Sequence, residues 1–378
     1  MQVISIVMAF FALLGAIDYV TGNHIGVGKE FEKAIEMLGT LSLSMIGMII
    51  LAPVIGHYLY EPLQELSKVI PFEPSFVAGL LLSSDGGGAP LAMELASSLE
   101  VGYFNGLVVA SMFGTMVVYT LPYAIMTTKK EQRDVLMLGM LCGISTIPVG
   151  CIVAGFMSGI AFLELLKSML PLLLLSGILI FGLLKFTQIT VKCLDVFGKF
   201  MKYVILFGFT VGVFEALTGW DVVPYTASLF VGAEAVFTVA IFLAGILPLM
   251  YLVTKLAKNP LQRLGKGLKI NETSVLGLFT SLATTFPTFE MAKDMDEKGV
   301  AFNAAFSVSA CFVFGDHLAY TLSFNADWAL YVVVGKLLSA FASLALVAFI
   351  WHRKEKSRKG ILPLQSQETE NVAVCKEV

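Results

Sequence analysis

Long apolar stretches are the feature that most limits what this chain of 378 residues can fold into. Several run for roughly 18 residues or more, enough for a helix to cross the hydrocarbon core of a bilayer. Of all residues, 57% are apolar and only 14% are charged, whereas about 25% are charged in an average soluble protein. The sequence therefore predicts an all-α polytopic membrane protein. It excludes a soluble globular enzyme, a disordered chain and a nucleic-acid-binding protein with a basic face.

Eleven apolar segments can be marked along the chain. They cover Ile4–Val20, Glu36–Leu59, Ser75–Leu95, Tyr103–Met126, Val135–Ile160, Met169–Leu184, Tyr203–Leu217, Gly232–Leu256, Ser274–Ala292, Ala301–Phe324 and Trp328–Trp351. The first lacks a basic start and carries Asp18 where a signal peptide would need small residues, so we expect a transmembrane helix there. The residues after Trp351 are basic and then polar, which predicts a disordered tail.

The two halves of the chain repeat each other at an offset near 198 residues. The plainest match pairs EPLQELSK at Glu61–Lys68 with NPLQRLGK at Asn259–Lys266. Further matches in the same order pair Gly15 with Gly212, Asp18 with Glu215, Gly47 with Gly245, Gly79 with Gly277, Asn105 with Asn303 and, after a three-residue insertion, Gly114 with Gly315. We expect a membrane repeat over residues 1–160, a linking helix and cytoplasmic loop over 161–200, a second membrane repeat over 201–352, and a basic tail over 353–378.

The distribution of Lys and Arg indicates how the two repeats are oriented. If the third and ninth segments are re-entrant hairpins, 22 of the 25 basic residues lie on one face, with Lys68 and Lys167 on the other and Lys336 inside the membrane. The positive-inside rule favours this arrangement of nine full spans and two hairpins, with inverted repeats, an external N-terminus and a cytoplasmic C-terminus. The alternative is eleven full spans and a weaker charge bias.

Both proposed hairpins are interrupted by polar residues and proline. In the first, Ser83–Pro90 reads SSDGGGAP, and in the second Thr284 and Thr285 precede Phe286 and Pro287. Non-helical backbone at membrane depth persists only where protein or water satisfies its polar groups. In secondary transporters with inverted repeats, such breaks meet near the midplane and form the binding site.

Asp85 is the first candidate for a binding residue, because a carboxylate inside the membrane is costly unless it is paired or hydrated. The alternative is a capping residue for the half-helix that follows. Asp316 and His317 lie in the tenth segment, where the first repeat has Thr115 and Met116. Asp316 could bind a cation or form a structural pair with Lys336. His317 could relay protons or simply hydrogen-bond a carbonyl group, and the second is the simpler expectation.

Other polar residues complete the set of candidates. Ser84, Thr284, Thr285, Asn303 and Glu290 could line the same cavity and supply hydrogen bonds to a ligand. Structural or pathway roles are expected for Asn105, which matches Asn303 in the repeat, for the prolines Pro148 and Pro287, and for Lys336.

The sequence contains no catalytic or metal-binding motif such as HExxH, a Walker loop or GxSxG, and its five cysteines have no metal-ligand spacing. We therefore expect no enzyme, no cofactor and no metal. Transport would be passive or driven by an ion gradient.

Several short motifs occur in a specific order: Asp85-x-Gly87-Gly88, TIPVGC at Thr146–Cys151, GDHL at Gly315–Leu318 and VGKL at Val334–Leu337. With these motifs, the sequence resembles the EutH family of bacterial ethanolamine-utilization transport proteins over nearly the whole chain. The resemblance implies uptake of ethanolamine, mainly as the protonated amine, across the bacterial inner membrane.

The residues themselves fit such a substrate. Asp85 and Asp316 would balance the ammonium charge, and the hydroxyl and amide side chains would bind the substrate hydroxyl. An H⁺- or Na⁺-coupled symporter of another small polar metabolite is the main alternative, and a membrane-embedded enzyme or sensor that uses Asp316 and His317 is a second. The lipid bilayer is the expected environment, no nucleic acid is expected as a partner, and homo-oligomerisation stays open.

Overall fold

The computed structural model describes residues 2–256, 263 and 265–374, and this part of the chain consists of helices joined by short loops, without strands. The first half contains α1 (Gln2–Thr21), α2 (Val27–Leu41), α3 (Gly47–Val69), α4 (Phe76–Leu81), α5 (Ala89–Leu95), α6 (Leu99–Tyr103), α7 (Leu121–Thr127), α8 (Arg133–Met157) and α9 (Phe162–Lys185). The second half contains α10 (Thr187–Thr218), α11 (Leu229–Leu256), α13 (Glu272–Ala283), α14 (Phe286–Glu290), α15 (Glu297–Ala310), α16 (Asp316–Asn325) and α17 (Ala329–Val374).

Short π-helical and 3₁₀ stretches connect several of these helices. The π-helical ones are η1 (Ser42–Ile46), η2 (Ser84–Gly88), η3 (Phe104–Gly114) and η4 (Met116–Thr120), and the 3₁₀ ones are η5 (Lys130–Gln132), η6 (Met291–Asp294) and η7 (Ala326–Trp328). Because η1 continues α2 into α3, residues 27–69 form one long helical stretch. It extends well beyond the span expected at Glu36–Leu59.

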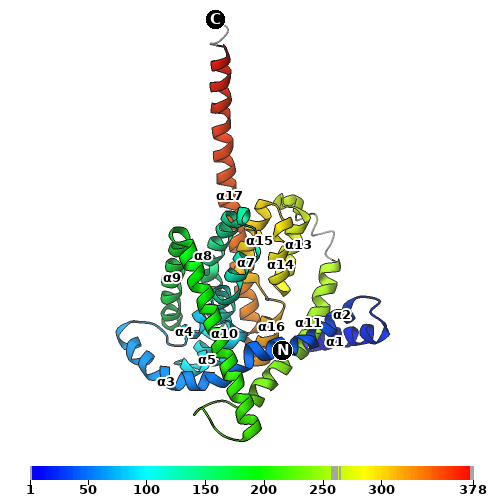
Figure 1. Cartoon of the computed structure of the whole chain (residues 1–378), viewed down its shortest axis with the longest axis vertical. Helices are drawn as coiled ribbons and strands as arrows, with labels where there is room; N and C mark the ends of the chain where they lie inside the picture. Colours follow the sequence, from blue (N-terminus) through cyan, green and yellow to red (C-terminus); the bar gives the residue numbers. More distant parts are fainter. Residues whose placement is uncertain (1, 257–262, 264, 375–378) are drawn as a thin grey trace.

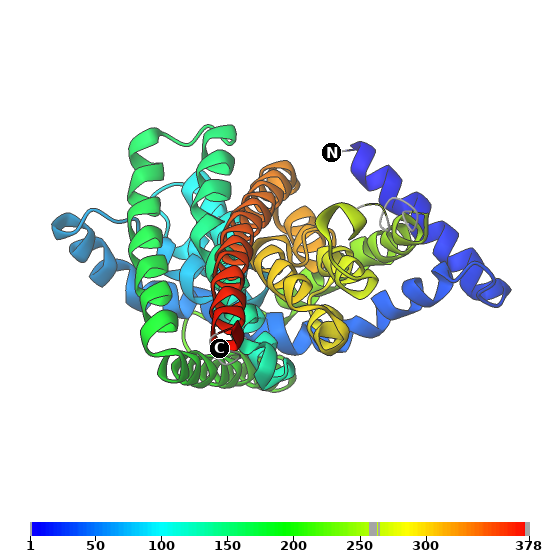
Figure 2. The same cartoon turned by 90° about the horizontal axis from the view of Figure 1, so that it is seen from above.

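Within the described residues, eight helical stretches are long and apolar enough to cross a membrane. They correspond to eight of the nine full spans expected from the sequence, which confirms a polytopic all-α membrane protein. α8 and α9 stand on one side of α17, and α13 and α15 stand on the other (Figure 1). Seen along α17, the blue helices α1 and α2 lie at the right-hand end of the molecule (Figure 2).

Helices of the two sequence halves are interleaved. α1 and α2 pack against α11, whereas α10 packs against α3. A Cβ atom added at Gly47 would lie 1.7 Å from the carbonyl oxygen of Ile205, and one added at Gly245 would lie 2.2 Å from that of Met8. Both contacts need glycine, because any side chain would overlap the neighbouring backbone. Each of these two repeat-equivalent glycines thus allows a helix of the other half to pack closely against it.

The third and ninth segments are both interrupted helices whose two ends lie together. Glu73 accepts hydrogen bonds from the backbone N–H (3.0 Å) and the hydroxyl (2.8 Å) of Ser97, across the base of the first segment. Asp296 accepts from the backbone N–H of Asn271 (3.0 Å) and the hydroxyl of Ser274 (2.7 Å), across the base of the second. The polar bonds at each base hold the start of the segment beside its end.

The tenth segment, expected as a full span over Ala301–Phe324, is not one continuous helix. α15 ends at Ala310, and α16 begins only at Asp316. Between them, the backbone N–H groups of Phe312 and Phe314 donate to the carbonyls of Ser281 and Leu282, at 3.1 and 2.8 Å. Carbonyls of the last turn of α13 need such external donors, because the helix ends there. The break in one helix therefore stabilises the break in the other.

Two further expectations differ from the structure. The loop expected before residue 200 is helical, because α10 already begins at Thr187, and its exposed surface carries an Asp195–Lys199 pair at 2.7 Å. The backbone of α17 stays helical to Val374 instead of becoming irregular after Trp351, as the high helix propensity of Lys, Arg, Glu and Gln permits. Most of the NPLQRLGK match lies outside the described residues.

Candidate functional site

Asp85 lies in the break of the first interrupted segment, and the local sequence explains how that break is held. The Ser83 hydroxyl accepts from the backbone N–H of Gly86 at 2.9 Å, which caps the half-helix that follows. Gly87 has a φ of 101°, which is readily available only to glycine. A Cβ added at Gly114 would lie 1.8 Å from the carbonyl oxygen of Leu82. The break therefore packs directly against η3. Only 9% of the Asp85 surface is exposed.

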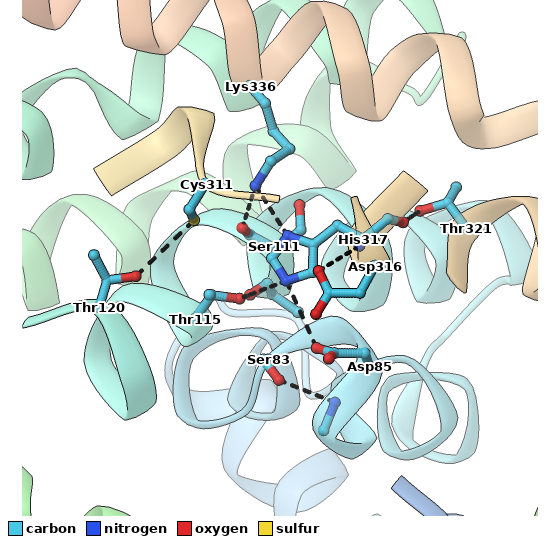
Figure 3. A network of polar contacts seen from close by, with 12 residues as sticks. Ser83, Asp85, Ser111, Thr115, Thr120, Cys311, Asp316, His317, Thr321 and Lys336 are labelled. Carbon is cyan, nitrogen blue, oxygen red and sulfur yellow. Dashed lines mark hydrogen bonds and ion pairs between the residues drawn. The ribbon is translucent and has the colours of Figure 1, made fainter. Parts of the chain in front are cut away.

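Asp85, His317 and Lys336 form a chain of polar contacts through the interior (Figure 3). The His317 Nε2 atom lies 3.6 Å from Oδ1 of Asp85, and its Nδ1 atom lies 3.2 Å from Nζ of Lys336. Lys336 is fully buried and also donates to the backbone carbonyl of Ser111. Thr115 places its hydroxyl 3.3 Å from His317 Nε2. The imidazole thus lies between a buried carboxylate and a buried ammonium.

Asp316 begins α16 beside this chain of contacts. Its Oδ1 atom accepts from the backbone N–H of His317 at 2.9 Å, and its side chain lies next to the imidazole in Figure 3. Within the described residues, no Asp316–Lys336 ion pair occurs within 4.0 Å, so that alternative is not observed. Lys336 instead bonds to His317, and the His317 ring faces Asp85, Thr115 and Lys336. Tertiary packing across α16 and α17 decided these partners.

Several buried polar atoms around Asp85 have no hydrogen-bond partner among the described residues. They are Oδ1 of Asp85, the hydroxyl of Ser84 and the hydroxyl of Tyr320, which is 1% exposed. Buried polar groups in proteins are nearly always satisfied by protein, water or a ligand. A carboxylate oxygen and two hydroxyl groups suit a small ligand that carries a positive charge and its own hydroxyl.

The second break reaches the same centre through aromatic residues. Phe286, next to Thr285 and Pro287, packs edge-on against Phe312 with ring centroids 5.8 Å apart. Phe312 in turn lies 5.1 Å from the His317 ring. Thr284 ends α13, and Thr285 is buried. The two breaks thus approach the segment around His317, the first by polar contacts and the second by aromatic ones.

The remaining sequence candidates lie away from these contacts. Asn303 donates to the carbonyls of Ser274 and Gly299 and fixes the base of the second segment. Asn105 does the same for the first segment by donating to the Ser75 hydroxyl at 2.8 Å. Glu290 is exposed and accepts from the Tyr123 hydroxyl at 2.8 Å. These placements indicate anchoring or surface roles.

Pro148 lies inside α8, two residues before Gly150, where α8 packs closely against α17. A Cβ at Gly150 would lie 2.1 Å from the carbonyl oxygen of Gly335, which directly precedes Lys336. The TIPVG stretch therefore supports the helix that carries the buried lysine. It acts through packing and does not contact the charged residues in the described hydrogen bonds.

A cavity of about 1460 Å³ opens beside the centre. Its lining residues include Tyr119 and Phe286. Its charged lining residues, called the basic rim here, are four basic side chains (Lys130, Arg133, Lys192 and Lys199) and two acidic ones (Asp134 and Asp195). The Tyr119 hydroxyl lies 3.3 Å from where a Cβ at Gly86 would stand. The cavity therefore extends from a basic rim to the residues next to Asp85.

Sequence reasoning did not select Ser83, Ser111, Thr115, Tyr119 or Tyr320. A signal was present for Thr115, because the alignment of the two sequence halves pairs it with Asp316. A signal was also present for Tyr119 and Tyr320, because the repeat aligns these two tyrosines with each other. Ser111 has no distinctive sequence context. No group of three or more His, Cys, Asp or Glu residues that could hold a metal occurs within the described ranges.

Comparison with known proteins gives consistent matches over almost the full chain. The sequence model of the family described as "Ethanolamine utilisation protein, EutH" matches residues 1–350. The chain is 37% identical to "Probable ethanolamine permease EutH" of Listeria monocytogenes over 358 residues, which cover 95% of this chain and 96% of that protein. It is 30% identical over 387 residues to the protein of the same name in Escherichia coli, covering 92% and 95% of the two chains. The uncharacterized protein YxeR of Bacillus subtilis is 35% identical over 344 residues, 91% of this chain and 93% of its own. No solved structure matches the chain.

Proposed function

Because the chain belongs to the EutH family of ethanolamine utilisation proteins, we propose that it is a permease that carries ethanolamine across the bacterial inner membrane. Relatives named as permeases, together with eight apolar helices, support a transport protein rather than an enzyme. The observation that carries the proposal is the buried Asp85 carboxylate, whose Oδ1 atom accepts no hydrogen bond from the described residues, in a break that also contains the Ser84 hydroxyl without such a bond.

Protonated ethanolamine is a small cation with one hydroxyl group, and crossing the membrane requires replacement of its hydration. In the proposed complex, Asp85 and Asp316 bind the ammonium group through charge-assisted hydrogen bonds. Ser84 and Tyr320 bind the substrate hydroxyl, since both have free hydroxyl groups in the interior. His317 contacts the Asp85 carboxylate, and Lys336 holds the His317 ring in place.

The proposal includes two inverted repeats, each with a re-entrant hairpin. Two sets of equivalent contacts support it: the bases of both segments are closed by carboxylate hydrogen bonds, and Asn105 and Asn303 anchor them in the same way. Thr115 also contacts His317, the residue next to its repeat equivalent Asp316. Contacts between such nearly equivalent positions are expected near the axis relating two inverted halves, where transporter sites lie.

The proposed orientation puts the N-terminus outside and the C-terminus in the cytoplasm, because most Lys and Arg residues then face the cytoplasm. With this orientation, the cavity with the basic rim opens inward. A second cavity of about 810 Å³ opens outward and is lined by Glu61, Glu94 and the stacked rings of His57 and Tyr225. Carboxylates and aromatic faces attract an organic cation, so this side suits capture of the substrate.

Cysteine labelling tests the hairpins and the orientation together. In a chain with Cys193 and Cys375 both replaced by Ser, single cysteines at Ile70 and Leu99 flank the first hairpin, and one at Lys269 lies before the second. We expect a membrane-impermeant maleimide added outside to label the first two but not the third. Labelling of Ile70 and Leu99 from opposite faces would show that the segment crosses the membrane.

Uptake of labelled ethanolamine into vesicles that contain the full chain tests the function. We expect saturable uptake above that of protein-free vesicles, measured at acidic pH because the neutral amine then contributes little diffusion. Imposed Na⁺ and H⁺ gradients and a panel of amino acids and nucleobases test the symporter alternative. Uptake of another metabolite, driven by an ion gradient and without saturable ethanolamine uptake, would contradict the proposal.

A further inference from the structure

Four ionisable side chains from three parts of the chain meet in the interior. Asp85 comes from η2, Asp316 and His317 from α16, and Lys336 from α17. The other titratable groups that face them are Tyr119 from η4, Tyr320 from α16, and the thiols of Cys151 and Cys311. These phenols and thiols are uncharged at neutral pH. The charge of the centre therefore depends on the two carboxylates, the histidine and the lysine.

Lys336 and His317 together carry one positive charge. Their nitrogens are 3.2 Å apart, and a hydrogen bond there uses one proton: the ammonium donates and Nδ1 of the neutral imidazole accepts. The ring proton is then on Nε2, which points toward Thr115 and Asp85. A second ring proton would lie on Nδ1 and face the ammonium. The contacts thus favour a neutral His317 beside a charged Lys336.

Two carboxylates and one ammonium leave the centre with a net charge of −1. Lys336 is fully buried and Asp85 is 9% exposed, so little solvent is available to stabilise that charge. An unbalanced charge is strongly unfavourable at this depth, and movement of the empty site through the membrane would be slow. One further cation restores neutrality, either as a proton on a carboxylate or as the ammonium of a substrate.

We propose that Asp85 and Asp316 hold either one proton or one substrate ammonium, and that the protein exchanges the two across the membrane. This inference rests on the proposed function, because it takes ethanolammonium as the cation. When the ammonium binds, the proton leaves the carboxylate pair to water in the open cavity. A proton from the other side replaces the ammonium after its release. Each cycle moves one cation each way and transfers no net charge.

The test uses proteoliposomes that contain the full chain, with protein-free liposomes as the correction for diffusion of the neutral amine. Labelled ethanolamine counterflow at equal pH on both sides first measures transport itself. An inward ethanolamine gradient then moves protons outward in a 1:1 ratio, measured with a pH dye in the lumen. An inside-negative potassium diffusion potential leaves the initial uptake rate unchanged, because the exchange is electroneutral.

The outcomes distinguish the proposed exchange from the proposed transport function. If counterflow is intact but uptake is accelerated by the negative potential and moves no protons, the exchange is overturned and the proposed function stands. If counterflow is absent, both are overturned. A 1:1 ratio with no effect of the potential supports the exchange.

Asp316→Asn provides a second measurement. It makes the empty centre neutral without a proton, so we expect the KM for ethanolamine to rise about tenfold or more. The remaining transport should move no protons and should become sensitive to the membrane potential. A merely structural role of Asp316 would lower the rate without changing the proton ratio. Glu65→Gln is the matched control, since Glu65 is exposed and pairs with Lys68 on the surface.

Discussion

Replacement of Asp85 by Asn is expected to reduce ethanolamine uptake at acidic pH by about 100-fold or more, because the ammonium loses its buried charged partner. Asn keeps the size of the side chain, and the Ser83 and Gly87 features that shape the break do not involve the carboxylate. Folding and membrane insertion should therefore be largely retained. Initial uptake rates, normalised to the amount of protein in the membrane, measure the effect.

The same assay on Glu65→Gln provides the control, because this substitution also removes one carboxylate charge but at an exposed surface position. We expect its uptake to match that of the unchanged chain, since exposed ion pairs contribute little. Normal uptake by both Asp85→Asn and Asp316→Asn, with protein levels unchanged, would disprove the site assignment.

Gly114→Ala is expected to abolish most transport although the substitution adds only one methyl group. The new Cβ would lie 1.8 Å from the carbonyl oxygen of Leu82, and backbone at such a distance must move. Overpacking of this kind costs about 1–3 kcal/mol. The displacement would fall on the break that carries Asp85. We expect a lowered melting temperature in detergent and uptake reduced by at least about tenfold.

Gly177→Ala is the matched control, because no atom lies within 4 Å of the position of its added Cβ. This glycine lies in α9, where alanine has the higher helix propensity. Unchanged or slightly raised stability with normal uptake is therefore expected. If Gly114→Ala behaves like this control, the close contact between η3 and the first break is not needed for transport.

Much of the architecture could be predicted from the apolar pattern. Eight of the apolar segments marked in the sequence match described helical stretches long and apolar enough to cross a membrane, because a helix that crosses a bilayer needs a long apolar run. Both interrupted segments were found because three glycines at Gly86–Gly88, and the threonines before Pro287, oppose continuous helix. Asp85, His317 and Lys336 stood out because ionisable groups are rare in such segments.

The break at Cys311–Gly315 could not be predicted in the same way. CFVF is as apolar as its neighbours, and its backbone leaves the helix because the end of α13 supplies carbonyls to Phe312 and Phe314. For Asn303, the repeat match with Asn105 indicated a structural role in helix–helix hydrogen bonding, but its partner could not be predicted. Its amide serves the backbone of Ser274, a partner that is 29 residues away in sequence.

The sequence by itself determined that the chain is a multi-helix membrane protein, where two of its segments are interrupted and that Asp85, His317 and Lys336 are inside. These properties depend on local composition, because burial in lipid and helix propensity act on each segment separately. Only the tertiary structure decided that Lys336 pairs with His317 rather than Asp316, and that His317 faces Asp85. Such partners lie on different helices, and a sequence records neither their distance nor their orientation.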